Sequence, residues 1–311
     1  MIVSSKVTQH YKQVLIVDYL ASRFTYRPQE EWLAFVQNGR ISVNNKISTA
    51  ATLVTQGDLV RCDLPDPPIP ADVNFDYSII YEDEWFIAAN KPGNLRVHDS
   101  RQYAQANLIY LIREKHEPPY PEASLINRLD RDTSGVIILA RDTETLKLIQ
   151  EAFKTQQVKK EYLALVAGIP ASTNGVIDLP ISKMKSPFGV HRYGVDEENG
   201  KTAVSHYETV QTFGSQYALL KLQPQTGRTH QLRVHLHAIG HPIVGDKLYH
   251  MSDEAFLDWV QTRQPLPNEL IARQALHCIR NSFVHPYTNK SLTLEAPLPK
   301  DFQDLLSQIK A

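Results

Sequence analysis

The stretch NRLDRDTSGVIILARD, residues 127–142, changes character halfway along its length. Its first part is polar and carries two arginines and two aspartates, with Asp130 among them, whereas GVIILA, residues 135–140, is uninterruptedly apolar. A short apolar run that follows a glycine is typical of a buried strand. The polar residues then lie in a turn directly before a rigid strand, which is a favoured place for catalytic groups.

Taken alone, this turn has a second interpretation. Aspartates and the Thr133-Ser134-Gly135 segment can simply bond backbone amides at the start of a strand. For an isolated Asp-x-x-Ser-Gly pattern, that structural role is the more common one.

The rest of the chain after residue 71 alternates strand-like runs with fewer helical segments. The helical segments are residues 143–157 and a short one near His230, and the apolar runs are YSIIY (77–81), WFIAANK (85–91), YLALVAG (162–168) and YALLKLQP (217–224). Because strands outnumber the helices that could cross between parallel strands, we expect an α+β fold with a mixed, mainly antiparallel sheet.

The front of the chain has the pattern of a separate small α+β module. The segment EEWLAFVQNGR, residues 30–40, spaces Trp32, Phe35 and Val36 for one buried helical face, and Gly39 is a stop signal. Turn signals follow at residues 44–45 and 57–58. The proline-rich PDPPIP, residues 65–70, can sustain neither a helix nor an inner strand. We therefore expect domains at 1–65 and 66–311.

Composition limits the classes of protein that the chain can belong to. Its 311 residues are 42% hydrophobic and contain no apolar run of membrane-spanning length, and the first twenty residues lack the apolar core of a secretory signal. Two cysteines, Cys62 and Cys278, are too few for a disulfide framework. We expect a cytoplasmic monomer with no membrane association.

The formal net charge of −1 argues against a nucleic-acid partner, since phosphate binders usually carry a basic excess. The average conceals local differences. Residues 65–126 hold ten acids and five bases, whereas residues 221–249 hold four bases, four histidines and one acid. A local basic surface is compatible with these counts, as is a scattered solvated surface.

Five motifs in order resemble the RluA-type RNA pseudouridine synthases. NRLDRDTSG resembles the H-R-L-D-x-x-T-S-G signature of that family, and the others are YEDEWFIAANKPGNLRVH (81–98), KKEYLALVAG (159–168), TGRTHQLRVHLHAIGHPIVGDKLY (226–249) and RQALHC with APLPKDF near the C-terminus. Together they cover nearly all of residues 75–302. The front module, with GRISVNNK and VTQGDLV, is similar to the small S4-type RNA-binding domain that often precedes this catalytic domain.

The chain departs from the family pattern at several places. Asn127 stands where the family usually has histidine, and Ser205 stands where threonine is common. The segment NLRVHD, residues 94–99, replaces the commoner G-L-x-V-H-P. Asn127 is nearest the chemistry, so it bears on how the substrate is positioned.

The resemblance implies an isomerase that acts on uridine in ribosomal or transfer RNA and requires no cofactor and no metal. Such an enzyme breaks the bond between ribose and a base nitrogen, rotates the uracil, and rejoins it through carbon. By resemblance Asp130 is the catalytic carboxylate, Arg233 its cationic partner in bidentate geometry, and Tyr162 the ring that stacks on uracil.

Further residues are assigned to RNA binding. Arg128 is expected to fill the gap left by a flipped-out uridine, Leu276 to pack beneath the base, and Arg228 to contact RNA. Within the front module Arg40 and Lys46 are expected to contact phosphates. For Tyr162 and Leu276 a plain core position remains an alternative.

The segment after Arg228 has the pattern of a short amphipathic helix. Thr229 is a candidate N-cap, Gly240 and Pro242 form a stop signal, and one apolar stripe carries Leu232, Leu236 and Ile239. The opposite stripe holds His230, Arg233 and His237 at spacings of three and four, with Arg233 at its centre.

Two other functions fit parts of the sequence. Four histidines at 230, 235, 237 and 241 suggest a metalloenzyme, but His230 and His237 would lie about 10.5 Å apart along a helix axis, which one ion cannot bridge. A non-catalytic RNA-binding protein that retained the synthase fold is the alternative suggested by Asn127. The sequence leaves open which RNA and which uridine are modified, and whether Asp130 attacks the sugar or the base or removes a proton.

Overall fold

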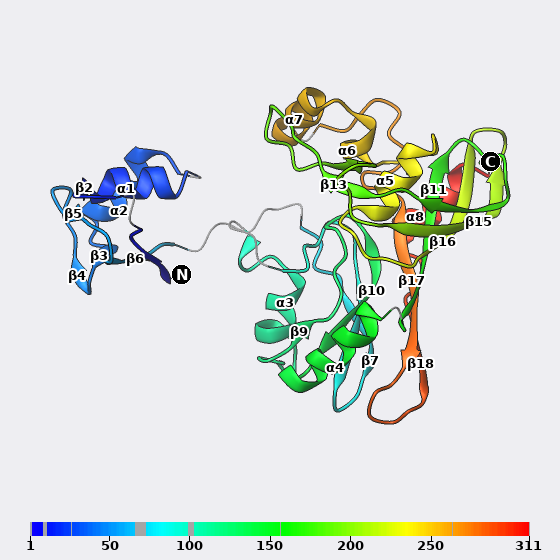
Figure 1. Ribbon diagram of the computed structural model, residues 1–311, viewed down its shortest axis with the longest axis horizontal. Coiled ribbons are helices and arrows are strands. Elements are labelled where there is room, and N and C mark those ends of the chain that lie inside the picture. Colours follow the sequence, from blue (N-terminus) through cyan, green and yellow to red (C-terminus); the bar gives the residue numbers. More distant parts are fainter. Residues whose placement is uncertain are drawn as a thin grey trace. The chain divides into compact units, whose positions relative to one another are not determined.

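The chain forms two compact units, residues Met1–Pro68 and Ile69–Ala311, in the computed structural model (Figure 1). The structure describes residues 2–8, 11–25, 27–65, 73–98, 103–155, 157–262 and 264–310. The linker expected at residues 65–70 therefore lies, from residue 66 onward, outside the described residues. No helix within the described ranges is both long enough and apolar enough to cross a bilayer.

The first unit contains two helices and two small sheets. The helices are α1 (Ile16–Arg23) and α2 (Gln29–Gln37). One sheet has the antiparallel order β1-β6-β3-β4, and β2 pairs with β5 in the other. The strands are β1 (Ile2–Lys6), β2 (Val14–Leu15), β3 (Ile41–Val43), β4 (Lys46–Ile47), β5 (Leu53–Val54) and β6 (Leu59–Asp63).

The local signals in this unit act as the sequence predicts. Helix α2 buries Trp32 and Val36 fully and Phe35 partly, so the predicted helical face is confirmed. Asn44 and Asn45 both have positive φ, 49° and 65°, as a tight turn between β3 and β4 requires. Because its buried residues form one cluster of their own, the unit has an independent hydrophobic core.

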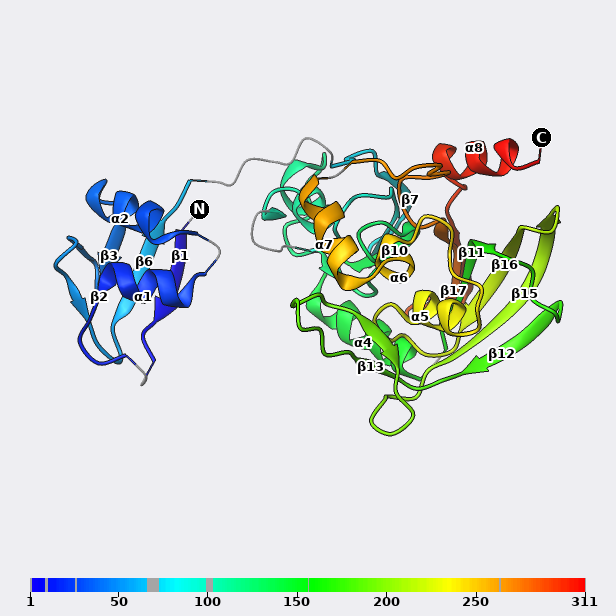
Figure 2. The ribbon, with the colours of Figure 1, turned by 90° about the horizontal axis from the view of Figure 1, so that it is seen from above.

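The second unit is built on a ten-stranded sheet (Figures 1 and 2). Eight of its strands follow the order β12-β15-β16-β11-β17-β10-β8-β7, and the other two are β18, which pairs with β17, and β9, which pairs with β10. A separate pair is formed by β13 (Ile181–Lys183) and β14 (Tyr193–Val195). The strands of the main sheet are β7 (Ser78–Glu82), β8 (Phe86–Lys91), β9 (Ser124–Leu125), β10 (Ser134–Ala140), β11 (Lys159–Ala167), β12 (Asn174–Asp178), β15 (Val204–Phe213), β16 (Tyr217–Pro224), β17 (Leu276–Val284) and β18 (Ser291–Glu295).

The sheet is mixed and mainly antiparallel, which confirms the predicted α+β fold class. Among the described strands, β10 and β17 are the one parallel pair, and they meet at Ser134 opposite His277 and Gly135 opposite Cys278. Every residue of β10 is buried. The uninterrupted apolar run of residues 135–140 thus forms a central strand, as its composition predicts.

The second unit contains the two helices that the sequence predicts and several that it does not. The expected helix at 143–157 is α4 (Thr143–Lys154) and the one near His230 is α5 (Gln231–Ala238), which gathers with α6 (Lys247–His250) and α7 (Asp253–Thr262) on one side of the unit (Figure 2). The remaining segments are α3 (Leu108–Tyr110), a π-helical turn at Leu111–Lys115, and α8 (Lys300–Gln308).

Strand register brings the chemistry-bearing motifs to one level of the sheet. Gly135 lies opposite Lys91 of β8 on one side and Cys278 of β17 on the other. Cys278 in turn lies opposite Tyr162 of β11. Gly135 has φ +115°, and a Cβ there would stand 2.1 Å from the carbonyl oxygen of Cys278. Only glycine permits this close approach, which fixes where the loop before β10 begins.

Candidate active site

A cavity of about 1130 Å³ lies in the second unit at the amino-terminal end of β10. The six site residues that the sequence predicts in this unit all line it: Arg128, Asp130, Tyr162, Arg228, Arg233 and Leu276. They come from the loop before β10, from β11, from the segment before α5, from α5 itself, and from the start of β17. The other two predicted residues, Arg40 and Lys46, are exposed in the first unit.

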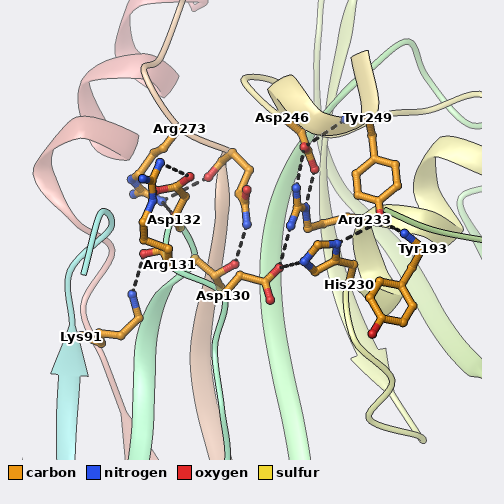
Figure 3. A network of polar contacts seen from close by, with 12 residues as sticks. Lys91, Asp130, Arg131, Asp132, Tyr193, His230, Arg233, Asp246, Tyr249 and Arg273 are labelled. Carbon is orange, nitrogen blue, oxygen red and sulfur yellow. Dashed lines mark hydrogen bonds and ion pairs between the residues drawn. The ribbon is translucent and has the colours of Figure 1, made fainter. Parts of the chain in front are cut away.

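Arg233 is the cationic partner of Asp130, but the geometry differs from the prediction. Its Nη1 donates to Oδ2 of Asp130 at 2.8 Å, a single hydrogen bond. Its Nε and Nη2 donate to the two carboxylate oxygens of Asp246 at 2.6 and 2.8 Å. The expected bidentate pair therefore forms with Asp246 and not with Asp130. Figure 3 shows the guanidinium held between the two carboxylates.

This arrangement keeps Asp130 ionised. Burial of Asp130 raises its pKa, but His230 when protonated, the charges of Arg233 and Lys91, and the hydrogen bond from Arg233 outweigh burial and lower the pKa below its usual value. The pKa of His230 is itself lowered by burial, so Arg233 supplies the charge that persists at neutral pH. The site thus holds a carboxylate that can act as a nucleophile or as a base.

Three buried donors fix the backbone and side chains of the three residues after Asp130. Nζ of Lys91 donates to the carbonyl oxygen of Arg131 at 2.9 Å, and Nη1 of Arg273 donates to that of Asp132 at 3.0 Å. Nε2 of Gln274 donates to Oγ1 of Thr133 at 2.9 Å. The loop that carries the carboxylate is therefore held on consecutive residues by groups from β8 and from the segment before β17.

Lys91 is fully buried, and its ammonium group acts only on backbone oxygens. Besides Arg131 it donates to the carbonyl oxygens of Pro92 at 2.7 Å and Leu95 at 2.8 Å. Burial lowers the pKa of Lys91 to about 7, while Asp132 and Asp130 act in the opposite direction. Three carbonyl oxygens require three N–H donors, which only the ammonium form provides.

The start of α5 differs from the predicted cap. Thr229 is not the N-cap; His230 occupies that position with φ 57° and ψ 17°. No side chain caps the first turn of α5; instead, Oε1 of Gln231 accepts from the backbone N–H of Arg228 at 3.0 Å and from the hydroxyl of Thr226 at 2.7 Å. A glutamine inside the helix thereby orders the loop before it.

The predicted short helix is α5, but more of it is buried than its apolar stripe alone requires. All residues from Gln231 to Leu236 are buried, including His235 on the stripe next to the apolar one. His235 bonds Oγ of Ser205 at 2.9 Å and the carbonyl oxygen of Leu179 at 3.0 Å. Gln231, Arg233 and His235 are therefore bonded within the protein, whereas His237 near the end of the helix is exposed.

The four histidines of this region do not converge on one point, although His230 and His237 both contact the ring of Tyr249. His230 points to Asp130, His235 to Ser205, and His241 to the carbonyl oxygen of Ala167, while His237 is exposed. In the part of the chain that the structure describes, no three His, Cys, Asp or Glu residues are grouped so that they could hold a metal ion.

Tyr162 and Leu276 form an apolar part of the cavity wall. Tyr162 is 9% exposed and Leu276 is 4% exposed, so each offers only a small surface to the cavity. Burial, together with Cys278, raises the pKa of Tyr162 well above its usual value, so that its hydroxyl stays protonated. A flat neutral ring at this place suits a planar base.

The cavity wall is basic, although the net charge of the whole chain argued against a nucleic-acid partner. Eight arginines and lysines line the cavity against three aspartates, in a chain whose formal net charge is −1. Arg128 is exposed, and Arg228 is anchored by a hydrogen bond to the carbonyl oxygen of Thr202 at 3.0 Å. The basic excess is concentrated where a polyanion would enter.

The residues that depart from the family pattern have defined partners. Oδ1 of Asn127 accepts from the backbone N–H of Ile138 at 2.8 Å, which ties the loop to β10. Oγ of Ser205 is buried between Nε2 of Gln231 and Nδ1 of His235, at 2.9 Å from each. Asn127 thus lines the cavity and fixes its loop, whereas Ser205 lies outside the cavity and bonds two residues of α5.

The residues missed by sequence reasoning are Lys91, Asp246, Arg273, Gln274 and the tyrosine at 249. All five lie within motifs quoted above, but no local spacing links them to Asp130. Two signals were available in the sequence: Lys91 at the end of an otherwise largely apolar run, and the Gly245-Asp246 pair that precedes a short helix.

Fold and site together are those of an enzyme with an ionised carboxylate in a basic cavity, and comparison with known proteins identifies its family. The profile of the RNA pseudouridylate synthase family matches residues 85–238. Ribosomal large subunit pseudouridine synthase C of Buchnera aphidicola is 31% identical over 94% of this chain and 93% of its own length. Ribosomal large subunit pseudouridine synthase D of Pseudomonas aeruginosa is 30% identical over 94% and 92%.

A solved structure gives the same result for the fold. The protein titled Human RNA Pseudouridylate Synthase Domain Containing 4 is 28% identical, with a TM-score of 0.58 over 75% of this chain and 93% of its own. The chain belongs to the RNA pseudouridine synthase family, and it is an isomerase that converts uridine in RNA to pseudouridine.

Replacing Asp246 by asparagine tests the bridge through Arg233. The change keeps the volume but leaves a buried guanidinium with one carboxylate, which we expect to cost about 3 kcal/mol of unfolding free energy and to lower the isomerisation rate. Urea unfolding and single-turnover rates provide the measurement. As a control, Glu208→Gln breaks an exposed pair with Lys221 and should cost less than about 1 kcal/mol. An Asp246 variant that behaves like this control would contradict the bridge.

Proposed function

We propose that Asp130 is the catalytic carboxylate of this synthase. One observation carries the proposal: its carboxylate opens into the basic cavity while Arg233, itself buried and bonded to Asp246, donates to one of its oxygens. The carboxylate is 29% exposed on its side chain, so it is ionised, oriented and accessible together. Those are the requirements for a group that reacts with a substrate.

Tyr162 is proposed as the platform for the uracil ring. It lines the same cavity and stands on β11, whose register places it beside β17 and the loop before β10. Stacking holds a detached base in place and still lets it turn in its own plane, because an aromatic face has no directional partner there. Leu276 is proposed to pack against the base from below.

Arg128 and Arg228 are proposed to contact the RNA around the target. Arg128 is exposed two residues before Asp130, where it can fill the space left by a uridine that has turned out of its stack. Such flipping costs a few kcal/mol, so a substitute for the missing base lowers that cost. Arg228 is held by the carbonyl oxygen of Thr202 and suits a phosphate contact.

The proposed substrate is ribosomal RNA, with transfer RNA as the other class. The relatives compared above are named as ribosomal large subunit synthases, which favours the first. We propose that the protein works in the cytoplasm, as a monomer. The reaction transfers no electrons and no group from a donor, so it needs no cofactor.

The first unit is proposed to be an S4-like RNA-binding domain that adds affinity. Its own core, its two helices and its antiparallel sheet fit a module that folds by itself. Arg40, which follows α2, and Lys46, at the start of β4, are both exposed and therefore able to reach phosphates.

Asp130→Asn tests the assignment of the catalytic carboxylate. The variant keeps the side-chain volume and removes the charge, and Arg233 retains its two bonds to Asp246, so the protein should fold and bind RNA normally. We expect isomerisation to fall by at least about 10⁴-fold, as for the removal of a nucleophile in other enzymes. RNA from cells that lack the gene is the substrate, and pseudouridine is measured by nucleoside chromatography. Appreciable turnover would sink the assignment of Asp130.

Deleting residues 1–65 tests the role of the first unit. RNA binding should weaken, and its log–log salt dependence should flatten by about one unit for each phosphate that the protein no longer neutralises. Single-turnover rates at saturating enzyme should stay close to those of the intact chain. If the truncated protein binds RNA with unchanged affinity and salt slope yet unfolds at a lower temperature, the unit serves stability and the proposal is wrong.

A further inference from the structure

His230 occupies an unusual backbone position beside Asp130. Its φ of 57° and ψ of 17° place it in the left-handed region, which is uncommon for residues other than glycine and is costly enough to need support from its surroundings. The side chain is 17% exposed and lines the cavity. Strain of this kind is concentrated at functional sites, so the orientation of this ring calls for an explanation.

Hydrogen bonding determines which ring nitrogen carries the proton. The hydroxyl oxygen of Tyr249 accepts from the backbone N–H of Tyr193 at 3.3 Å and lies 3.0 Å from Nδ1 of His230. Burial raises the pKa of Tyr249 well above its usual value, so the hydroxyl keeps its proton. Among the described residues, the one acceptor for that proton is Nδ1 of His230. A hydroxyl that donates to Nδ1 favours the neutral ring with its proton on Nε2.

Nε2 of His230 faces the cavity with its donor unused. It lies 3.8 Å from Oδ2 of Asp130, too far for a hydrogen bond (Figure 3). Within the ranges that the structure describes, no other acceptor lies within hydrogen-bond distance of this atom. A strained residue that aims a free N–H at the space next to the catalytic carboxylate is placed to donate to a substrate.

The chemistry of the reaction supplies an acceptor at that place. When the glycosidic bond breaks, its electron pair leaves with the uracil, which becomes an anion with charge on N1 and the carbonyl oxygens. Asp130 loses its own charge in the reaction, whether it forms a bond to the sugar, forms a bond to the base or takes up a proton. Negative charge thus moves from Asp130 to the uracil, while the donors around the carboxylate, Arg233 and His230, stay in place.

We propose that His230, as its neutral Nε2–H tautomer, is a catalytic residue that donates a hydrogen bond to a carbonyl oxygen of the detached uracil, and that Tyr249 is the positioning residue that fixes this tautomer. The proposal rests on Asp130 being the reacting carboxylate. His230 forms and breaks no covalent bond; the carbon-bound proton that the uracil loses and the proton that its N1 gains are exchanged apart from it.

The surroundings of His230 keep the ring neutral. Charged groups that face it are Asp130, Arg233 and Asp246, and the uncharged rings of Tyr193 and Tyr249 contact it edge-on. Burial lowers the pKa of His230, Asp130 raises it, Arg233 lowers it and Asp246 raises it, with a net shift below the usual value. A neutral donor leaves Asp130 without an ion pair from this side, so the carboxylate stays reactive.

Variants at 230 separate donation from structure. In His230→Ala we expect the single-turnover rate to fall about 10²–10³-fold, the cost of removing one donor from a developing anion, with RNA affinity unchanged. His230→Gln, whose amide N–H can reach toward the position of Nε2, should recover part of that rate. His191→Ala alters an exposed histidine of the same unit that does not line the cavity, and it should turn over normally. A normal rate in His230→Ala, or an effect confined to RNA affinity, would overturn the proposal.

The tautomer is tested directly by nitrogen NMR of protein labelled with ¹⁵N-histidine. The resonances of His230 are assigned among the twelve histidines by their absence from His230→Gln. We expect a protonated Nε2 and an unprotonated Nδ1 at neutral pH, and a mixture of tautomers in Tyr249→Phe together with a slower rate and unchanged RNA affinity. A wild-type ring protonated on Nδ1 would refute the mechanism even if the alanine variant failed to fold.

The failure of this inference is distinguishable from that of the proposed function. If Asp130→Asn is inactive and His230→Ala is normal, Asp130 keeps its role and only the donor is wrong. If Asp130→Asn turns over, the premise of both is removed.

Discussion

The buried guanidinium of Arg233 is the group on which the rest of the site depends. An arginine that is 7% exposed can remain there only if its charge is neutralised and its N–H groups are bonded. Asp246 meets most of that requirement through two bonds, and Asp130 meets the rest through one. Because the bond to Asp246 fixes the plane of the guanidinium, the third N–H points in one direction, and that direction sets the place of the reacting carboxylate. Burial lowers the pKa of Arg233, but the two carboxylates raise it further, so it stays charged.

The fold brings Asp130 to that place through the sheet. Glycine at 135 lets β10 approach β17 closely in the parallel pair, and Lys91, opposite Gly135, holds the carbonyl oxygen of Arg131. Arg273 holds Asp132 from the other side and is itself bonded to Asp301. A loop fastened on consecutive residues loses little entropy when substrate binds, because it is already ordered. Precision in this site therefore comes from strands and buried donors, while the basic cavity wall supplies attraction for RNA.

The sequence was most informative where the signal is local. The apolar run of residues 135–140, the helical spacing of Trp32 and Val36, and the positive φ at Asn44 each follow from a few neighbouring residues. Resemblance to the family's motifs also located the cavity, because the six site residues that it assigned within the second unit all line that cavity. What could not be read was long-range geometry: that Asp246 takes the bidentate pair, that Gln231 bonds the loop before α5, and that the first six residues of α5 are all buried. Each depends on which elements pack together, and spacing along one helix does not reveal its neighbours.

The most direct test of this account is the single-turnover rate of Arg233→Lys. Lysine keeps the positive charge, but its ammonium is a single point on a flexible chain and cannot hold Asp246 through two parallel bonds while donating to Asp130 in a fixed direction. If orientation of Asp130 by a bridged guanidinium is the central constraint, the rate falls severely while RNA affinity is retained. A rate close to that of the wild-type enzyme would show that charge alone suffices and would contradict the account.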